Sequence, residues 1–204
     1  MQRIGLLGGS FNPPHNAHLA LARAALVQLK LNRVDLMPAG APWQKKTTVM
    51  VSAKQRLAMC HAVVDGVAGL GVEPYETTHE RPTYTIETLT ALCLRNPSNE
   101  YTLIIGADQA NAFQSWQRWQ DILKRCQLAV VARSGAPVVW QADVVTELAK
   151  LQHKPTVLEM PDSTLSSTAI RAAIMNGESV ANALPAAVAR YIVEHSLYSK
   201  SENL

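Results

Sequence analysis

One stretch near the N-terminus decides the fold: Ile4-Gly5-Leu6-Leu7-Gly8-Gly9-Ser10-Phe11-Asn12-Pro13-Pro14-His15-Asn16-Ala17-His18. Its apolar residues predict a short buried strand, the paired glycines predict a turn, and the residues after the prolines predict the start of a helix. Glycines let backbone N–H groups approach an anion closely, and a helix N-terminus adds the positive end of its dipole. A strand, a glycine turn and a helix in this order therefore predict a phosphate-binding site.

Two histidines at the end of this stretch, His15 and His18, add a second signal. At a spacing of three residues they lie on one side of the first helical turn and point to the same place. The stretch contains neither G-x-x-x-x-G-K-[ST] nor G-x-G-x-x-G, so it differs from the common phosphate loops. A metal site would need further ligands, and no nearby Cys or Glu completes one, so we expect no metal held by the protein. The alternative for His18 is a packed helix residue above Ala22, Ala25 and Leu29.

Length and composition favour one soluble globular domain over residues 1–204, with 48% apolar and 17% charged residues. The net charge of +3 is too small to argue for nucleic-acid or membrane binding, although it suits anionic nucleotides. The first apolar run is too short for a signal peptide, and no run approaches a membrane span. Three widely spaced cysteines, Cys60, Cys93 and Cys126, predict buried reduced thiols. We therefore expect a cytoplasmic protein.

Short aliphatic runs alternate with longer helical patterns along the chain. The runs predict strands at 4–7, 34–37, 71–73, 103–105, 128–132 and 156–159. The helical patterns lie at 16–30, from Ser52 onward, and at 86–94, 139–151, 168–175 and 185–195. This alternation predicts an α/β fold of the Rossmann-like class, with an open, mainly parallel sheet and helices on both faces.

Two of these helices carry clear end signals. Ser52 and Gln55 form a capping box, and Asn176-Gly177 predicts the end of the penultimate helix. The helix after Ser52 also has an apolar stripe that we expect to face the core: Leu57, Cys60, Val64 and Val67.

The polar motifs follow the ends of the predicted strands. Gly106-Ala107-Asp108 follows the fourth strand, Arg133 follows the fifth, and Ser166 to Arg171 open a late helix. In open parallel sheets, ligands bind at the carboxyl ends of the strands. Because separate motifs converge on this edge, we expect one binding site there.

Three motifs together resemble a known family. Residues 8–18 resemble the G-G-[ST]-F-[DN]-P-x-H-x-x-H signature of the nucleotidyltransferase superfamily, and residues 166–171 resemble its [IV]-S-[SA]-T-x-[IL]-R motif. Residues 81–89 resemble the P-[ST]-Y-T-x-x-T-L segment of the nicotinate branch. The sequence is thus most similar to the bacterial nicotinate-nucleotide adenylyltransferases, nearly from end to end.

This resemblance implies transfer of the adenylyl group from ATP to nicotinate mononucleotide, with release of pyrophosphate. ATP and nicotinate mononucleotide are then the expected partners, with no nucleic acid and no membrane, and a homo-oligomer stays open. Because the loop offers no dense carboxylate cluster, the expected cofactor is Mg²⁺ held mainly through the ATP phosphates.

The resemblance also assigns roles position by position. The catalytic residues are His15, His18 and Arg171. The ATP-binding residues are Gly8, Gly9, Ser10, Phe11, His15, His18, Gly106, Asp108, Ser166, Ser167, Thr168, Ile170 and Arg171. The residues expected to bind the acceptor substrate are Tyr84, Thr85, Trp116, Lys45 and Arg133. Structural alternatives are a helix cap at 166–168, a turn aspartate at Asp108 and core packing of Trp116, with Trp119 as the candidate core tryptophan.

Some positions depart from the family pattern. Asn12 stands where many relatives have Asp, and the lost charge argues against a direct metal contact there. Ala17 replaces a frequent Gly. Residues 42–45 read Pro-Trp-Gln-Lys in place of Pro-Pro-His-Lys, so only Lys45 carries over, and Arg133-Ser134 lacks the usual following proline.

Two kinds of alternative function follow from the same motifs. One is a sister enzyme: an adenylyltransferase for nicotinamide mononucleotide or phosphopantetheine, or a cytidylyltransferase. The other is a nucleotide-binding module without catalysis, in which these loops only sense ATP. Residues 82–89 and Trp116 favour the nicotinate branch, and intact His15, His18 and Arg171 favour catalysis.

Overall fold

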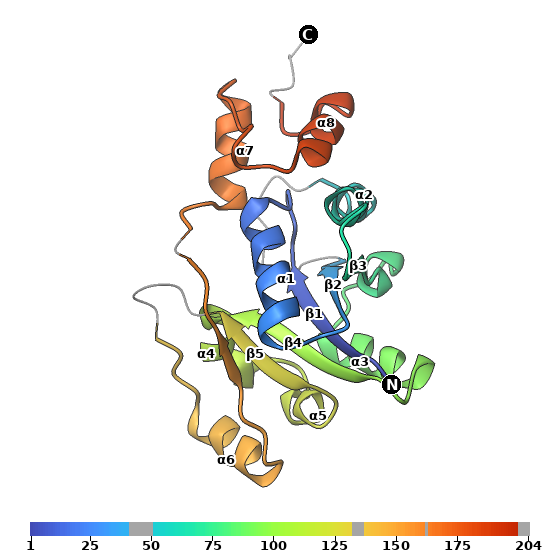
Figure 1. Ribbon diagram of the computed structural model, residues 1–204, viewed down its shortest axis with the longest axis vertical. Helices are drawn as coiled ribbons and strands as arrows, with labels where there is room; N and C mark the ends of the chain where they lie inside the picture. Colours follow the sequence, from blue (N-terminus) through green and yellow to red (C-terminus); the bar gives the residue numbers. More distant parts are fainter. Residues whose placement is uncertain (41–50, 132–136, 162, 200–204) are drawn as a thin grey trace.

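The computed structural model describes residues 1–40, 51–131, 137–161 and 163–199 (Figure 1). Over these residues it forms a six-stranded, all-parallel sheet in the order β3-β2-β1-β4-β5-β6. The strands are β1 (Arg3–Gly9), β2 (Arg33–Pro38), β3 (Leu70–Val72), β4 (Glu100–Gly106), β5 (Gln127–Val131) and β6 (Thr156–Leu158). The open parallel sheet expected from the sequence is confirmed, and each predicted strand is found.

Helices connect the strands and cover both faces of the sheet. They are α1 (Asn16–Gln28), α2 (Ala53–Val64), α3 (Thr85–Arg95), α4 (Ala107–Asn111), α5 (Trp119–Leu123), α6 (Ala142–Lys150), α7 (Ser167–Met175) and α8 (Ala186–Glu194), with 3-10 turns η1 (Tyr75–Thr78) and η2 (Phe113–Ser115). All the predicted helices are present. The sequence missed α4, α5 and the 3-10 turns, because elements this short hold too few apolar positions to set up a periodic pattern.

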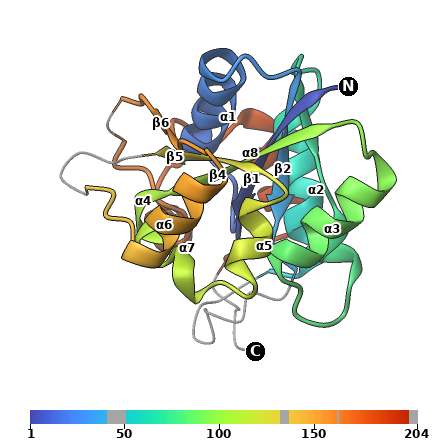
Figure 2. The ribbon, with the colours of Figure 1, turned by 90° about the horizontal axis from the view of Figure 1, so that it is seen from below.

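Alternation along the central strands builds two hydrophobic cores. Leu103 and Ile105 of β4 pack on one face with α3, α5 and α6, whereas Ile104 packs on the other face with α1, α2, α7 and α8. Figure 2 shows the sheet nearly edge-on, with α1 on one side and α3, α5 and α6 on the other. Because both faces are covered, the strands are apolar at consecutive positions.

The helix after Ser52 begins as predicted but buries a different face. The Ser52–Gln55 capping box is present, with the Gln55 backbone N–H donating to Oγ of Ser52 at 3.2 Å. The buried positions are Arg56, Met59, Cys60 and Val63. Of the predicted stripe, Cys60 is buried and Val64 packs against the core, whereas Leu57 is only half-buried and Val67 lies beyond the end of the helix. The stripe counted only apolar residues, whereas the buried face includes a charged arginine with hydrogen-bond partners inside the protein.

Two other local predictions are settled by the structure. Gly177 has a φ of 72° directly after α7, so the predicted glycine stop is confirmed. All three cysteines are free thiols, as expected, but only Cys60 and Cys126 are buried. Cys93 is half-buried on α3, so its predicted full burial was wrong.

Strand order places a site at the carboxyl ends of β1 and β4. From the central β1 the chain passes through α1 to β2 on one side, while β4 pairs with β1 on its other side. Such a reversal of strand order opens a crevice where ligands bind. Helices α7 and α8 lie together beyond this end of the sheet, where α1 begins (Figure 1). The connection between α7 and α8 contacts the start of α1 directly, since the Asn16 backbone N–H donates to the Ala183 carbonyl at 2.9 Å.

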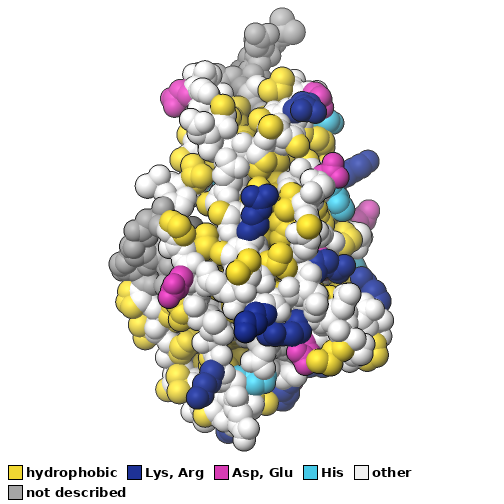
Figure 3. All heavy atoms as spheres, viewed as in Figure 1, with side chains coloured by type: hydrophobic (Ala, Val, Ile, Leu, Met, Phe, Trp, Pro, Cys, Tyr) yellow, Lys and Arg dark blue, Asp and Glu magenta, His cyan; other side chains and the backbone are white. Residues whose placement is uncertain are grey.

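Charged side chains are spread over the surface without forming one large patch of either sign on the face drawn in Figure 3. This agrees with the small net charge of +3. Across the described parts of the chain, no helix is both long enough and apolar enough to cross a lipid bilayer.

Candidate active site

A cavity of about 330 Å³ lies at the carboxyl ends of β1 and β4. It collects residues that are far apart in the sequence but were predicted to share one site. Seven of the predicted site residues line it: Gly8, Gly9, Ser10, Tyr84, Thr85, Gly106 and Trp116. The convergence expected at the strand ends is therefore found for Gly8-Gly9 after the first strand and for Gly106 after the fourth. Tyr84 and Thr85, predicted to bind the acceptor, line the same cavity.

The loop between β1 and α1 is buried from Phe11 to His15. Phe11 has a φ of 45°, which few residues other than glycine adopt, and it is 1% exposed. A Cβ on Gly9 would lie 3.1 Å from the Phe11 ring, whereas one on Gly8 would meet only Met37 at 3.5 Å. Gly9 thus makes room for the ring that folds back over it, and Gly8 presents its backbone to the cavity.

The two histidines open α1 with their rings side by side, as their spacing predicts. Their centroids are 3.8 Å apart, and the His18 ring lies 4.9 Å from that of Phe11. The His15 backbone N–H donates to Nδ1 of His18, with an N···N distance of 3.2 Å. Since Nδ1 is the acceptor, the ring carries its proton on Nε2, where it can donate to a phosphate oxygen. The helix cap thus fixes the tautomer of His18.

Helix α7 faces the same loop from the opposite side. Ser166 Oγ caps the helix by accepting from the Ala169 amide at 3.1 Å, and the Ser167 hydroxyl donates to the Pro13 carbonyl at 2.9 Å. Arg171 is 9% exposed and donates to the Asn12 carbonyl at 2.7 Å and to Thr168 Oγ1 at 3.3 Å. The segment therefore caps a helix, as the structural alternative predicts, and it also places the Arg171 guanidinium against the loop between β1 and α1.

The wall of the cavity away from the phosphate loop is formed by α3 and by Trp116. Tyr84 caps α3 without a side-chain hydrogen bond, and the first N–H groups of any helix have no partner within it. Trp116 is half-buried and lines the cavity, with its ring centroid 5.4 Å from that of Phe113. Trp119 is 8% exposed and packs in the core, as predicted for the second tryptophan.

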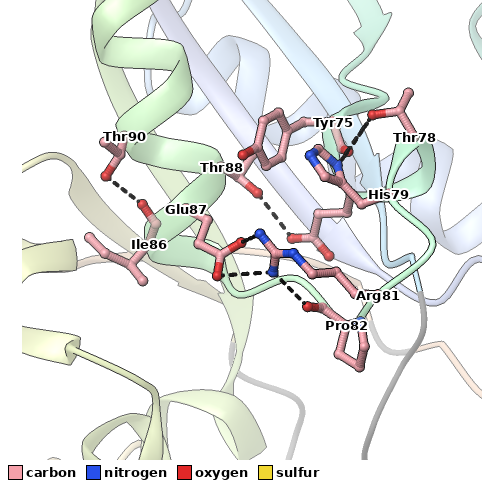
Figure 4. A network of polar contacts seen from close by, with 10 residues as sticks. Tyr75, Thr78, His79, Arg81, Pro82, Ile86, Glu87, Thr88 and Thr90 are labelled. Atoms are coloured by element: carbon pink, nitrogen blue, oxygen red, sulfur yellow. Dashed lines mark hydrogen bonds and ion pairs between the residues drawn. The ribbon is translucent and has the colours of Figure 1, made fainter.

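An ion pair offsets the negative charge of Glu87 in the first turn of α3. Arg81 donates to both carboxylate oxygens of Glu87, at 3.2 and 2.8 Å, and to the Pro82 carbonyl at 3.0 Å (Figure 4). The pair is exposed, so it adds little to stability. Its effect is electrostatic, because the fork of Arg81 offsets the charge of Glu87 next to the open N-terminus of the helix.

The remaining predicted residues lie elsewhere. Asp108 is exposed in the first turn of α4 and does not line the cavity. Ile170 is 3% exposed and packs in the core, and its backbone N–H donates to the Ser166 carbonyl at 3.0 Å. Lys45 and Arg133 lie outside the described residues.

Sequence reasoning missed Glu76, Gln109 and Gln117, which also line the cavity. Gln109 follows Asp108 and Gln117 follows Trp116, so they were within reach of the motifs. Glu76 carried no signal, because it lies in a short 3-10 turn without periodicity.

Glu76 is a buried carboxyl in the cavity wall, 7% exposed. Burial raises its pKa from 4.5 to about 7, although hydrogen bonds from the Gly40 amide and the Thr88 hydroxyl and the nearby Arg56 lower it. The turn is packed tightly, since a Cβ on Gly40 would lie 2.1 Å from the Glu76 carbonyl oxygen. Near neutral pH a large fraction of this carboxyl is therefore uncharged.

Comparison with known proteins agrees with this geometry. A family model described as cytidylyltransferase-like matches residues 6–173. A protein of Bordetella petrii, described as a probable nicotinate-nucleotide adenylyltransferase, is 45% identical over 97% of this chain and 100% of that protein. The chain belongs to the nicotinate-nucleotide adenylyltransferase family. A second family relative, from Methylibium petroleiphilum, is 38% identical over 97% of this chain and 93% of its own.

The fold of this family also appears among distant solved structures. The nicotinic acid mononucleotide adenylyltransferase of Plasmodium falciparum, solved in complex with NaAD, aligns with a TM-score of 0.77. The alignment covers 97% of this chain and 98% of that one at 15% identity. The family resemblance seen in three motifs therefore extends over nearly the whole chain.

Glu76 should make stability fall as the pH rises. Its folded pKa of about 7 lies above the ordinary 4.5, so its stabilising effect is complete below pH 4.5 and is lost as the pH rises through 7. The shift corresponds to a loss on the order of 3 kcal/mol across this range. We expect Glu76→Gln to flatten this part of the pH profile of the unfolding free energy, measured by denaturant titration.

A matched control keeps the Glu76 carboxyl and changes one of its partners. The Thr88 hydroxyl donates to Oε1 of Glu76 at 3.4 Å. Because this hydrogen bond lowers the pKa of Glu76, Thr88→Val should keep the pH-dependent fall in stability and extend it to higher pH. Parallel profiles for wild-type and Glu76→Gln protein would contradict the assignment.

Proposed function

We propose that the protein transfers the adenylyl group of ATP to nicotinate mononucleotide, giving nicotinate adenine dinucleotide and pyrophosphate. The observation that carries this proposal is that one loop borders both the cavity and the start of α1. Gly8 to Ser10 line the cavity, and His15 and His18 follow at the head of α1. A ring compound in the cavity and a triphosphate over α1 would meet at this loop.

The chemistry asks for positioning and charge neutralisation rather than for a nucleophilic side chain. An oxygen of the acceptor phosphate forms a bond to the α-phosphorus of ATP, while the bond from that phosphorus to the pyrophosphate oxygen breaks. The second pKa of a phosphate monoester is about 6, so the attacking oxygen is ionised at neutral pH without a general base. The loop amides, Nε2–H of His18 and the guanidinium of Arg171 are donors suited to the charge that develops.

The acceptor ring would lie in the cavity against Trp116, with its carboxylate at the first amides of α3. Those amides and the helix dipole favour an anion over a neutral amide that carries N–H donors of its own. Two carboxyls near this end of α3 repel such an anion only weakly, because Glu87 is paired with Arg81 and Glu76 is partly protonated. These contacts support nicotinate over nicotinamide as the acceptor ring.

A divalent ion would be held mainly by the substrate. In the described parts of the chain no three His, Cys, Asp or Glu side chains gather to hold a metal ion. At the phosphate loop the side-chain oxygen of Asn12 already accepts from the Tyr198 hydroxyl at 2.8 Å. Mg²⁺ that is bound by ATP oxygens and water fits this site, where it would neutralise phosphate charge.

Replacing His18 separates its helix cap from its proposed phosphate contact. In His18→Asn the side-chain oxygen can accept from the His15 amide as Nδ1 does, but nothing replaces Nε2. We expect stability close to wild type and turnover at least about tenfold lower, because losing a donor to developing charge costs a few kcal/mol. Pyrophosphate release with saturating substrates measures the effect. The exposed His61→Asn should keep full turnover, and a well-folded His18→Asn protein with normal turnover would exclude the catalytic role.

Acceptor choice tests the nicotinate assignment. We expect kcat/KM for nicotinate mononucleotide to exceed that for nicotinamide mononucleotide by at least tenfold, about 1.4 kcal/mol in transition-state binding. Trp116→Ala should lower both values by similar factors, since stacking does not distinguish the two rings. Equal use of both acceptors by wild-type protein would refute the assignment, and an effect confined to one acceptor would refute the stacking role.

The metal requirement is tested by chelation. After removal of divalent ions we expect pyrophosphate release to fall to background, and added Mg²⁺ should restore it, because triphosphate charge is then neutralised again. ATP binding measured in parallel separates lost chemistry from lost affinity. Full turnover in the chelated protein would show that protein donors alone suffice.

A further inference from the structure

The C-terminal end of the described chain returns to the phosphate loop through one side chain. Tyr198, just after α8, is 6% exposed, and its hydroxyl donates to the side-chain oxygen of Asn12 at 2.8 Å. The two residues are 186 positions apart in the sequence. No motif of the sequence pointed to Tyr198, and the mechanism above does not use it.

The backbone at this point is held in an unusual conformation. Tyr198 has a φ of 61° and Ser196 has a φ of 49°, both in the left-handed region that favours glycine. Residues other than glycine persist there only when the surroundings hold them. The Leu197 amide donates to the Ile192 carbonyl at 2.9 Å, which fastens this turn to the end of α8. The turn therefore aims the Tyr198 ring inward at the loop.

Asn12 is the point where several buried groups meet the loop. Arg171 donates to its carbonyl at 2.7 Å, while Tyr198 holds its side chain. Arg56, 1% exposed, donates to the Ser10 carbonyl at 2.9 Å and to the Gly40 carbonyl at 2.5 Å. The main chain of the loop is thus fixed by two guanidiniums, and the side chain at its centre is fixed by a phenol.

The phenol stays a neutral donor in this place. Burial raises the pKa of Tyr198, and this outweighs the opposite effect of Arg171 and Arg56 nearby. A neutral hydroxyl gives its one proton to the Asn12 oxygen, so the direction of the hydrogen bond is fixed.

We propose that Tyr198 is a positioning residue for the reaction. Its hydrogen bond to Asn12 holds in place the loop that connects the glycine turn to the histidine pair. A loop held at a side chain as well as at its carbonyls keeps the amides of Gly8 to Ser10 and the head of α1 in one arrangement for the triphosphate. A displacement of such donors by about 1 Å is enough to lower turnover about a hundredfold. This proposal rests on the proposed function for ATP as the nucleotide that is bound, but the binding comparison below does not depend on the identity of the acceptor.

Removing only the hydroxyl tests this role. Tyr198→Phe keeps the ring in its buried site. We expect ATP affinity, measured by calorimetry without acceptor, to fall by at least about threefold, because a loop released from this hydrogen bond occupies its binding arrangement for a smaller fraction of the time. Turnover should fall as well. The matched control is Tyr101→Phe, since Tyr101 is 3% exposed and donates to the Leu92 carbonyl at 3.2 Å away from the site. It should lower the unfolding midpoint by a similar amount while leaving ATP affinity and turnover at wild-type values.

The partner of the hydrogen bond gives a second measurement. In an Asn12→Ala background, which removes the acceptor, Tyr198→Phe should change ATP affinity by less than about 1.5-fold. In an Asn12→Asp background the acceptor remains, so Tyr198→Phe should again cost at least about threefold. Equal effects in all three backgrounds, or wild-type ATP affinity in Tyr198→Phe, would overturn the proposal. If wild-type protein turned over no nicotinate mononucleotide, the proposed function would fail while the binding comparison would still decide the role of Tyr198.

Discussion

The site depends on satisfying the backbone of one buried loop. Residues 11–15 are buried between β1 and α1, and buried carbonyl groups that lack hydrogen bonds are costly. Arg56 from α2 supplies a donor to Ser10, Arg171 from α7 supplies one to Asn12, and Ser167 supplies one to Pro13. These donors come from helices on one face of the sheet. The packing of that face therefore also fixes the shape of the loop.

That coupling explains why α7 and α8 lie beyond the carboxyl ends of the strands. Apolar residues of both helices complete the core that contains α1 and α2, while Ser167 and Arg171 of α7 donate to the loop at the same time. Burying an arginine is costly unless hydrogen bonds compensate for the lost water. Here both Nη atoms of Arg56 and Nη1 of Arg171 donate to backbone carbonyls, so two positive charges are built into the support of the loop.

The cavity at the carboxyl ends of β1 and β4 has different electrostatics from the loop. It contains an aromatic side chain, an open helix N-terminus and a carboxyl that burial leaves partly protonated. The one other acidic group at the start of α3, Glu87, is paired with Arg81. An anionic ring substituent would therefore meet donors and little opposing charge, which fits the substrate proposed for this cavity.

Sequence alone determined the features that depend on near neighbours along the chain. Strand–helix alternation predicted the parallel sheet, the Ser52–Gln55 spacing predicted a helix cap, and the glycine turn followed by His15 and His18 predicted the turn after β1 and the start of α1. Tertiary structure decided which charged or polar groups are buried. Arg56, Glu76 and Tyr198 follow no local pattern, and each takes its role from partners that other elements bring to it. Tyr198 and Asn12 are 186 positions apart in the sequence, and the packing of α8 brings them together. A periodic pattern of apolar residues describes only near neighbours along the chain, so it cannot predict such a contact.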